Sequence, residues 1–350
     1  MNYIGSKLRL IPFIEESILS IVDEKCDVFC DLFAGTGIVG ANFKRLGYRI
    51  ISNDLQYYSY VLNKQLIDNN EELEFCELEK ELSELKNISK PERKIFICRY
   101  LSTLEGYKGF IYKNYSPSET SERMYLTSSN AQKCDAIRKK IEKWKNLNLI
   151  NNNEYYFLLA SLIRSVDKHA NVLSVYGAYL KYFKNIALKD LIIEPCDLIR
   201  NYKMNEVYNE DANQLIKKIH SDILYLDPPY NTRQYSTNYH LLETIAKYDK
   251  PKIYGKTGLR EYQDQKSLYC LKTFAKEALE DLIKNANTKY IFMSYSNEGI
   301  MSNYDIKNIL ANKGEYGCVE IKHSRYKSDS TREYKANYTT EYLHYCKCNT

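Results

Sequence analysis

Two kinds of hydrophobic pattern divide the chain. Short apolar runs bounded by turn residues predict buried strands at 26–31, 48–55, 222–227, 289–296 and 340–347. Between the first two runs, residues 38–47 have a helical pattern that ends at Gly47, a residue type favoured just beyond a helix. This order of strand, turn, helix and strand predicts a βαβ unit, and therefore a parallel sheet.

The middle of the chain is dominated by helical patterns instead. The predicted elements are a charged amphipathic helix at 71–86, a loop at 108–130, a basic helix at 131–145 and a buried helix at 154–170. We therefore expect a doubly wound, mostly parallel α/β sheet whose sequence is split by an insertion. Residues 1–55 and 206–350 would form the sheet domain, and residues 56–205 a mainly helical insertion.

Composition and charge limit the possible classes of protein. The chain has 350 residues, of which 44% are hydrophobic, and this is ordinary for a globular protein. A net charge of +5 permits nucleic-acid binding without requiring it. No apolar run approaches the roughly 18 residues of a membrane span, and no signal peptide is evident, so a cytoplasmic location is expected. The ten cysteines form no CxxC pair, which predicts reduced thiols and no structural zinc.

The segment "DLFAGTG" carries the first candidate for chemistry. Gly35 and Gly37 follow a predicted strand and open a helix, so the backbone can approach a ligand closely. Asp54 ends the next strand about 20 residues on, where a ribose hydroxyl pair would find an acceptor. The third glycine of a dinucleotide fingerprint is absent, which argues against a nicotinamide-dependent oxidoreductase. The pattern favours a nucleoside-like ligand that has no obligatory pyrophosphate.

The segment "LYLDPPYNTRQY" carries the second candidate. Two prolines cannot donate to a ladder, so the strand must end before Pro228. The Asp227 carboxylate and the Pro228 carbonyl would then point outward at the carboxyl edge of the sheet, where ligands bind in open α/β folds. Tyr230 adds a flat ring beside these two acceptors. Such a group suits a planar base that bears an exocyclic amino group.

Together, "DLFAGTG" and "DPPY" resemble the S-adenosylmethionine-dependent amino-methyltransferases, specifically the D12 class of DNA adenine N6-methyltransferases. "NYIGSK" (2–7) looks like the N-terminal cofactor motif of that family, and "NEDANQLI" (209–216) looks like the segment whose acid holds the adenine of the cofactor. The resemblance implies a seven-stranded methyltransferase sheet. The catalytic residues it implies are Asp227, Pro228, Pro229 and Tyr230. The residues it implies for the cofactor are Tyr3, Lys7, Asp31, Phe33, Gly35, Gly37, Asp54, Asp211 and Asp227.

The implied reaction is methyl transfer from S-adenosyl-L-methionine to the N6 atom of an adenine in double-stranded DNA. Hydrogen bonds from the amino group to Asp227 and Pro228 would localise the nitrogen lone pair. The adenine must be flipped out of the duplex, and Tyr230 would stack on it. Because no covalent intermediate is needed, Pro195-Cys196 is interpreted as structural. An RNA adenine methyltransferase and a non-catalytic nucleic-acid-binding relative remain as alternatives.

The resemblance also implies partners. The insertion occupies the place of a target-recognition region, and a restriction endonuclease acting on the same sequence is a possible companion. Three clusters mix basic and aromatic residues and are candidates for DNA contact. They are "RQYSTNYH" (233–240), "KPKIYGKTGLREY" (250–262) and "SRYKSDSTREYK" (324–335).

Overall fold

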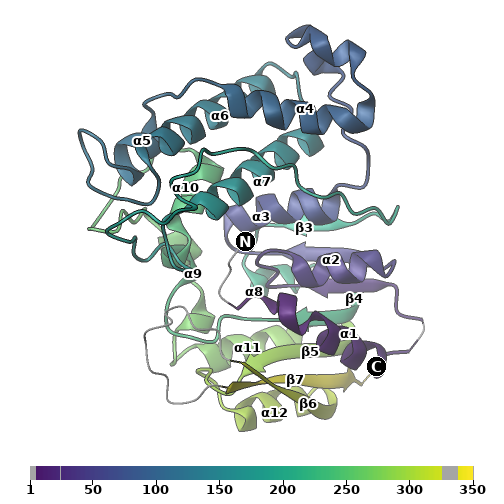
Figure 1. Cartoon of the computed structure of the whole chain (residues 1–350). Helices are drawn as coiled ribbons and strands as arrows, with labels where there is room; N and C mark the ends of the chain where they lie inside the picture. The colour runs from purple at the N-terminus through teal and green to yellow at the C-terminus, as the bar shows by residue number, and fades with distance from the viewer. Residues whose placement is uncertain (1–4, 24, 325–337, 350) are drawn as a thin grey trace. The chain divides into compact units, whose positions relative to one another are not determined.

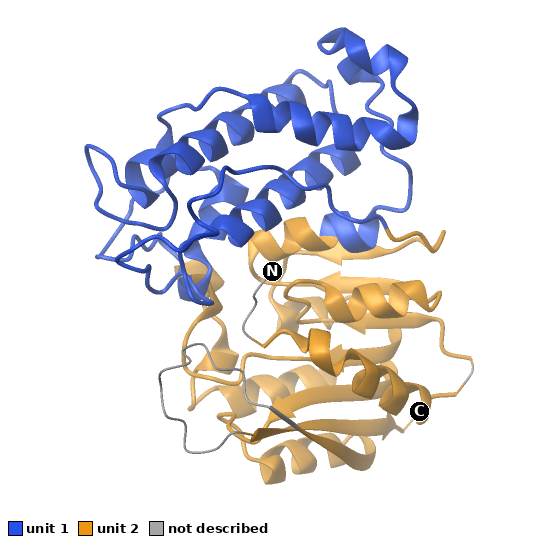
Figure 2. Cartoon of the chain, viewed as in Figure 1, with its two compact units in different colours: residues 1–4, 64–198, 237–262 blue, residues 5–63, 199–236, 263–350 orange. Residues whose placement is uncertain are grey.

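The computed structural model describes residues 5–23, 25–324 and 338–349 (Figure 1). The chain forms two compact units (Figure 2). The sheet unit contains Gly5–Asn63, Ile199–Ser236 and Gln263–Thr350, and the helical unit contains Lys64–Leu198 and Thr237–Tyr262. The sequence assigned residues 237–262 to the sheet domain, whereas they belong to the helical unit. The sheet is therefore interrupted twice along the chain.

The sheet unit is built on seven strands in the order β3-β2-β1-β4-β5-β7-β6. Their bounds are β1 Val28–Asp31, β2 Arg49–Asn53, β3 Glu206–Tyr208, β4 Ser221–Leu226, β5 Thr288–Ser296, β6 Gly314–Ser324 and β7 Tyr338–Cys348. The first five strands run parallel, and β7 lies antiparallel between β5 and β6. The expected doubly wound α/β class is confirmed, although the sequence patterns did not predict β3 and β6.

Helices cover both faces of this sheet. Those of the sheet unit are α1 Ile11–Leu19, α2 Ile38–Arg45, α3 Tyr57–Asn63, α8 Ala212–Leu215, α11 Ala275–Asn285 and α12 Asn303–Ala311, and α9 Tyr235–Asn238 crosses into the helical unit. Short 3₁₀ helices occupy Lys7–Leu10, Gln263–Gln265 and Leu268–Cys270. α2 ends as predicted, since Gly47 has a φ of +92° just beyond it.

Successive side chains of a strand point to opposite faces of the sheet, and each face packs against a different set of helices. On one face, Phe29 of β1 stacks on Phe43 of α2, with ring centroids 3.9 Å apart, and also contacts Tyr225 of β4. On the other face, the neighbouring residues Cys30 and Leu224 join a core with α8, α11 and α12. The central strands β1 and β4 are therefore buried on both sides, as parallel strands usually are.

The helical unit consists of α4 Lys90–Thr103, α5 Phe110–Tyr115, α6 Ser128–Asn146, α7 Asn152–His169 and α10 His240–Lys247. Two further 3₁₀ helices, Glu77–Lys80 and Ser83–Asn87, and one π-helical turn, Lys64–Asp68, complete it. The predicted helices at 131–145 and 154–170 correspond to α6 and α7. No helix in the described part of the chain has both the length and the hydrophobicity needed to cross a bilayer.

Two predictions in this unit are wrong. Residues 71–86 form two 3₁₀ turns rather than one amphipathic helix. Phe75 has a φ of +50°, and its N–H donates to Glu154 on α7, so the backbone leaves the helical region there. The predicted loop at 108–130 contains α5, whose first N–H groups are satisfied from outside the segment. Asp135 of α6 accepts hydrogen bonds from Ile111 N–H at 3.0 Å and Tyr112 N–H at 2.8 Å.

Replacing this distant cap should unravel α5. In Asp135→Ala, two backbone donors and the Tyr248 hydroxyl lose their acceptor inside the protein. We expect a loss of about 3 kcal/mol in stability, because each unsatisfied buried group costs roughly 1–3 kcal/mol. Hydrogen-exchange mass spectrometry should show lost protection in α5. The exposed Asp190→Ala serves as control. Unchanged protection of α5 in Asp135→Ala would contradict this role for Asp135.

Candidate active site

Three strand ends define the candidate site, at the point where the strand order reverses. β1 lies between β2 and β4, and Asp31 at its end is in register with Ser52 and Tyr225. Because all three strands are parallel, the residues that follow them emerge at the same edge of the sheet. This edge is where open α/β sheets bind ligands. As predicted, β4 ends at Leu226, just before Asp227 and the two prolines.

The glycine turn after β1 is held on both sides. Gly35 and Gly37 have φ angles of +52° and +77°, which favour glycine. The Gly35 N–H donates to Asp54 Oδ2 at 2.8 Å, and its carbonyl accepts from Asn63 Nδ2 at 3.1 Å. Asp54 Oδ1 accepts from the Gln56 N–H at 2.8 Å. The turn is therefore fixed in shape by Asp54, which follows β2, and by Asn63 of α3.

Asn53 is a structural residue that the sequence did not single out. Its side chain is 1% exposed and lies at the end of β2. Its amide nitrogen donates to the Leu32 carbonyl at 3.2 Å and the Glu210 carbonyl at 3.1 Å, and its oxygen accepts from the Glu210 N–H at 3.0 Å. A buried amide at the end of an otherwise apolar strand is the signal that could have revealed this role.

Asp31 is a buried carboxylate that is only partly satisfied. It is 1% exposed, and its Oδ2 accepts one hydrogen bond, from the Gly40 N–H at 3.2 Å. Its Oδ1 has no hydrogen-bond partner among the described residues. Burial, with the nearby charges of Asp227 and Asp54, raises the pKa of Asp31 to about 8. The electrostatic surroundings of this carboxylate therefore favour a cation.

Asp227 forms an ion pair with Lys7, from the motif near the N-terminus. Lys7 Nζ lies 2.9 Å from Asp227 Oδ1 and 3.0 Å from Glu341 Oε1 on β7. The lysine is 4% exposed, whereas the Asp227 side chain is 16% exposed. Burial raises the pKa of Asp227 to about 6; Lys7 opposes this shift and Glu341 adds to it. The ion pair with Lys7 is made through Oδ1, and the Asp227 carboxylate keeps some exposure at the edge of the sheet.

Tyr230 lies beside this ion pair. Lys7 Nζ is 5.5 Å from the centre of the Tyr230 ring, and the ring makes an edge contact with Tyr295, with centroids 6.1 Å apart. The Tyr230 carbonyl accepts from the Ile300 N–H at 3.0 Å, which fixes the backbone after the prolines. A Cβ atom on Gly5 would lie 3.3 Å from the Tyr230 hydroxyl. "NYIGSK" and "DPPY" are thus neighbours in the fold.

The remaining predicted residues are Phe33, Asp211, the two prolines and Tyr3. Phe33 makes an edge contact with Tyr269, at 5.0 Å between ring centroids, beyond the end of β1. Asp211 is exposed, and its side chain caps α8 by accepting from the Gln214 N–H at 3.1 Å, so helix capping alone accounts for an acid at this position. Pro228 is buried and Pro229 partly buried, directly after β4. Tyr3 lies outside the described residues.

Comparison with known proteins identifies the family. The family model for the D12 class N6 adenine-specific DNA methyltransferases matches residues 3–309. The chain belongs to this family. Its members methylate adenine in DNA, and family and fold together imply a methyl donor of the S-adenosylmethionine type. The resemblance read from "DLFAGTG" and "DPPY" is confirmed, and so is the assignment as a DNA adenine methyltransferase.

Individual relatives agree with the family. The chain is 47% identical to the type II methyltransferase M.NlaIII of Neisseria lactamica, with 98% of each chain covered. It is 37% identical to M.CviAII of Paramecium bursaria Chlorella virus 1, over 94% of this chain and 93% of that protein. It is 45% identical to M.FokI of Planomicrobium okeanokoites, over 99% of this chain. The chain spans about half the length of M.FokI, 52%.

The strand-end residues fit the methyl donor that the family implies. S-adenosylmethionine bears a sulfonium and an ammonium group, and it also has a ribose diol. The buried, unpaired oxygen of Asp31 suits a cationic group. Asp54 is partly exposed just after β2, and its carboxylate is an acceptor of the kind that a ribose diol needs. The glycine turn leaves room for close approach.

Other candidates from the sequence fare differently. In "RQYSTNYH", Tyr239 and His240 are fully buried, and in "KPKIYGKTGLREY" Arg260 is 6% exposed and pairs with Asp249. These three residues are therefore not available to DNA, contrary to the expectation for their clusters. Residues 325–335 of the third cluster lie outside the described residues. Cys196 is buried, and burial raises its thiol pKa, as expected for a structural cysteine.

Asp54→Ala should weaken cofactor binding. The change removes a charged acceptor from the predicted ribose position and also frees the Gly35 N–H. Hydrogen bonds to charged groups contribute roughly 1.5–3 kcal/mol, so the dissociation constant for S-adenosylmethionine should rise by about tenfold or more. Titration calorimetry provides the measurement, with the exposed Glu277→Ala as control. Equal affinities in parent and Asp54→Ala would remove Asp54 from the cofactor site.

Proposed function

We propose that this methyltransferase uses Asp227 as the acceptor for the amino group of a flipped-out adenine in duplex DNA. The observation that carries this proposal is the position of the partly exposed Asp227 carboxylate, at the carboxyl edge of β4, paired with Lys7 through Oδ1 and next to the ring of Tyr230. An adenine amino group that donates to the Asp227 carboxylate and to the Pro228 carbonyl would have its nitrogen lone pair localised out of the ring plane. Such localisation makes the nitrogen a better nucleophile.

Each residue after β4 has a part in this proposal. The prolines stop the ladder and fix the backbone of the acceptors. Tyr230 offers its ring to the flipped base, and stacking contributes roughly 1–3 kcal/mol per base at comparable nucleic-acid sites. The Tyr295 edge contact and the Ile300 hydrogen bond support that ring in one orientation. Asp227 and Pro228 thus hold the amino group, while Tyr230 holds the base.

We assign the cofactor to the carboxyl ends of β1 and β2, whereas the flipped base would bind after β4. Gly35 and Gly37 would line the methionine end, with Asp31 and Phe33 near them. Asp54 would hold the ribose and Asp211 the adenine, while Lys7 and Asp227 connect this site to the base. Bound S-adenosylmethionine would supply an activated methyl group. The fixed glycine turn supports this assignment, because a rigid loop loses little freedom when it binds a ligand.

The helical unit is the proposed target-recognition region. Its segment after α7 is irregular but firmly held, because the buried Asn171 donates to the carbonyls of Leu180 and Tyr182 and accepts from the Lys184 N–H. At its surface, Tyr182 is 70% exposed and Leu188 is 59% exposed. Exposed lysines lie nearby, at positions 181 and 189. A rigid loop that presents aromatic and basic groups suits contact with DNA.

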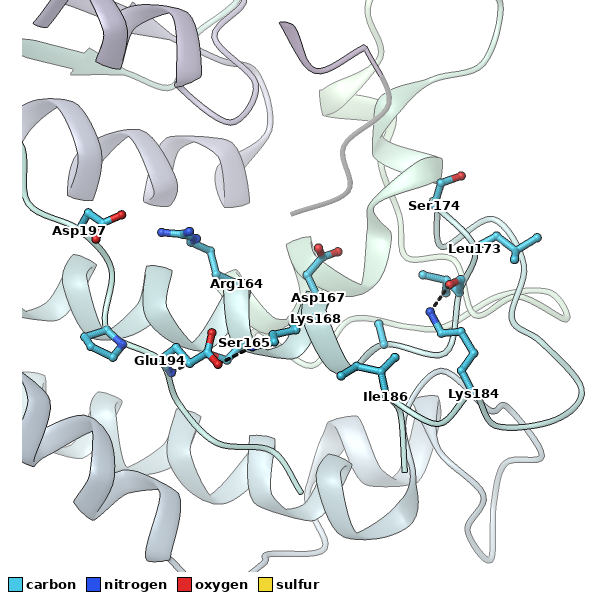
Figure 3. A pocket seen from close by; sticks show the side chains of 13 residues that line it. Arg164, Ser165, Asp167, Lys168, Leu173, Ser174, Lys184, Ile186, Glu194 and Asp197 are labelled. Atoms are coloured by element: carbon cyan, nitrogen blue, oxygen red, sulfur yellow. Dashed lines mark hydrogen bonds and ion pairs between the residues drawn. The ribbon is translucent and has the colours of Figure 1, made fainter. Parts of the chain in front are cut away.

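A cavity of about 440 Å³ lies beneath this loop, at the end of α7 (Figure 3). Its basic side chains already have partners. Lys168 pairs with Glu194, Lys184 donates to the Val172 carbonyl at 2.6 Å, and Arg164 is close to Cys196 and Asp197. The cavity therefore offers little unsatisfied charge to a small anion, and we assign it no ligand.

The biological setting is also a proposal. M.NlaIII, M.FokI and M.CviAII are named as type II methyltransferases. By analogy, this chain would modify a specific site in DNA and protect that site from a separate restriction endonuclease. The family assignment favours DNA over RNA, and the retained Asp227, Pro229 and Tyr230 favour an active enzyme over a binding relative. Label transfer from methyl-labelled S-adenosylmethionine to DNA and to RNA distinguishes these alternatives.

Asp227→Ala should abolish methylation while the fold and cofactor binding survive. Removing one strong transition-state interaction costs about 2.7–4 kcal/mol at comparable sites, which is a factor of roughly 10² to 10³ in rate. The measurement is single-turnover formation of N6-methyladenine in DNA, with the site located by sequencing. The surface variant Glu277→Ala should retain the parent rate. An Asp227→Ala enzyme working at close to the parent rate would show that "DPPY" is only a turn in this protein.

Tyr182→Ala should weaken DNA binding without slowing the chemistry. An exposed aromatic contact of roughly 1–3 kcal/mol corresponds to a rise of about fivefold or more in KM for the target DNA, with the single-turnover rate at saturation unchanged. The matched control is Tyr304→Ala, since Tyr304 is 72% exposed on α12 in the sheet unit. If both variants keep the parent KM, the loop after α7 does not contact DNA.

A further inference from the structure

One buried ammonium is shared by two carboxylates from distant parts of the chain. Lys7 opens the first 3₁₀ helix, Asp227 follows β4, and Glu341 lies on β7. The Nζ atom lies 2.9 Å from Asp227 Oδ1 and 3.0 Å from Glu341 Oε1. Lys7 is 4% exposed and the Glu341 side chain 5%. With all three groups ionised, this cluster holds two negative charges and one positive charge.

Glu341 is held in place independently of Lys7. Ser294 on the neighbouring strand β5 donates its hydroxyl to Glu341 Oε1 at 2.7 Å. The backbone of Glu341 is in register with Ser296 of β5 and Ile321 of β6, so it lies on the central strand of an antiparallel triplet. A buried carboxylate on such a strand is costly unless it has partners. Its partners here are a serine hydroxyl and the same ammonium that binds Asp227.

We propose that Glu341 is a positioning residue for methyl transfer, because it shares the Lys7 ammonium and so limits how strongly Lys7 holds Asp227. This inference rests on the proposed role of Asp227 as the acceptor for the adenine amino group. An ammonium bound to Asp227 alone would withdraw more charge from that carboxylate and make it a weaker acceptor. Glu341 holds the Lys7 ammonium between the two carboxylates. Lys7 can then orient Asp227 through Oδ1 while the Asp227 carboxylate stays a strong acceptor.

The proton equilibrium of Asp227 provides a readout that a merely structural role would not change. The titratable groups that face this cluster are Lys7, Asp31, Tyr225, Tyr230, Glu341 and His344. Burial raises the pKa of Asp227 to about 6; Lys7 opposes this shift, and the negative charge of Glu341 adds to it. In the proposed mechanism, Asp227 accepts the hydrogen bond from the adenine amino group in its ionised form. Activity should therefore be lost as the pH falls through this pKa.

The decisive variant is Glu341→Gln, which keeps the shape of the side chain but removes its charge. Without that charge the pKa of Asp227 falls, so the acid limb of the rate profile should move to lower pH, by about 1 unit. The single-turnover rate at neutral pH should fall by roughly threefold, as expected for a weaker acceptor. The control is Glu320→Gln, at an exposed glutamate on β6, which should keep the parent profile.

A second variant makes the same test without touching a charge. Ser294→Ala removes the hydroxyl that fixes Glu341, so the acid limb should move in the same direction by a smaller amount. This variant decides the matter if Glu341→Gln does not fold. An acid limb that stays at the parent position in every folded variant of these two residues would overturn the proposal.

The outcome for the proposed function is read separately. A parent enzyme that forms no N6-methyladenine, or an active Asp227→Ala enzyme, would refute the proposed function itself. An active parent and an inactive Asp227→Ala enzyme, together with an unmoved acid limb in Glu341→Gln and Ser294→Ala, would refute only the role of Glu341.

Discussion

The parallel pairing of β1 with both β2 and β4 is the constraint on which the site depends. It forces the three chain segments that follow these strands to leave the sheet at the same edge. Each segment brings a carboxylate there: Asp31, Asp54 and Asp227. Burial raises the pKa of Asp31 and that of Asp227, and the charges of Asp227 and Asp54 raise the pKa of Asp31 further. These carboxylates therefore need hydrogen-bond donors or a cation close to them.

Two kinds of donor bind these three carboxylates, backbone N–H groups and a lysine ammonium. Backbone N–H groups of Gly35 and Gln56 serve Asp54, and the Gly40 N–H serves one oxygen of Asp31. A lysine serves Asp227. Removing one partner of a buried ion pair generally costs about 3–5 kcal/mol, because the other charge remains buried and uncompensated. Lys7 is therefore as much a part of this site as the strand ends, although it lies near the start of the sequence.

Local signals in the sequence predicted much of this arrangement, and non-local contacts explain what they missed. The glycine turn and the end of β4 were predictable because glycine and proline act on their own backbone. The failures at 71–86 and 108–130 have one cause, because a residue outside each segment holds its backbone: Glu154 holds Phe75, and Asp135 caps α5. Glu341 likewise gains its meaning only from pairing with Lys7, and no local pattern on β7 indicates that contact.

The carboxylates at the sheet edge outnumber the cations there, and this excess negative charge links the cofactor site to the base site. Lys7 neutralises one of the carboxylates near it, while Asp31 keeps an oxygen without a partner and has a pKa of about 8. A cation that binds beside Asp31 would lower the pKa of Asp31 and, through the same field, that of Asp227. By linkage, such a cation binds more tightly to the ionised site than to the protonated one. A positively charged methyl donor would thus favour the ionised form of Asp31, whose pKa lies above neutral, so cofactor binding and the ionisation of this sheet edge would be linked.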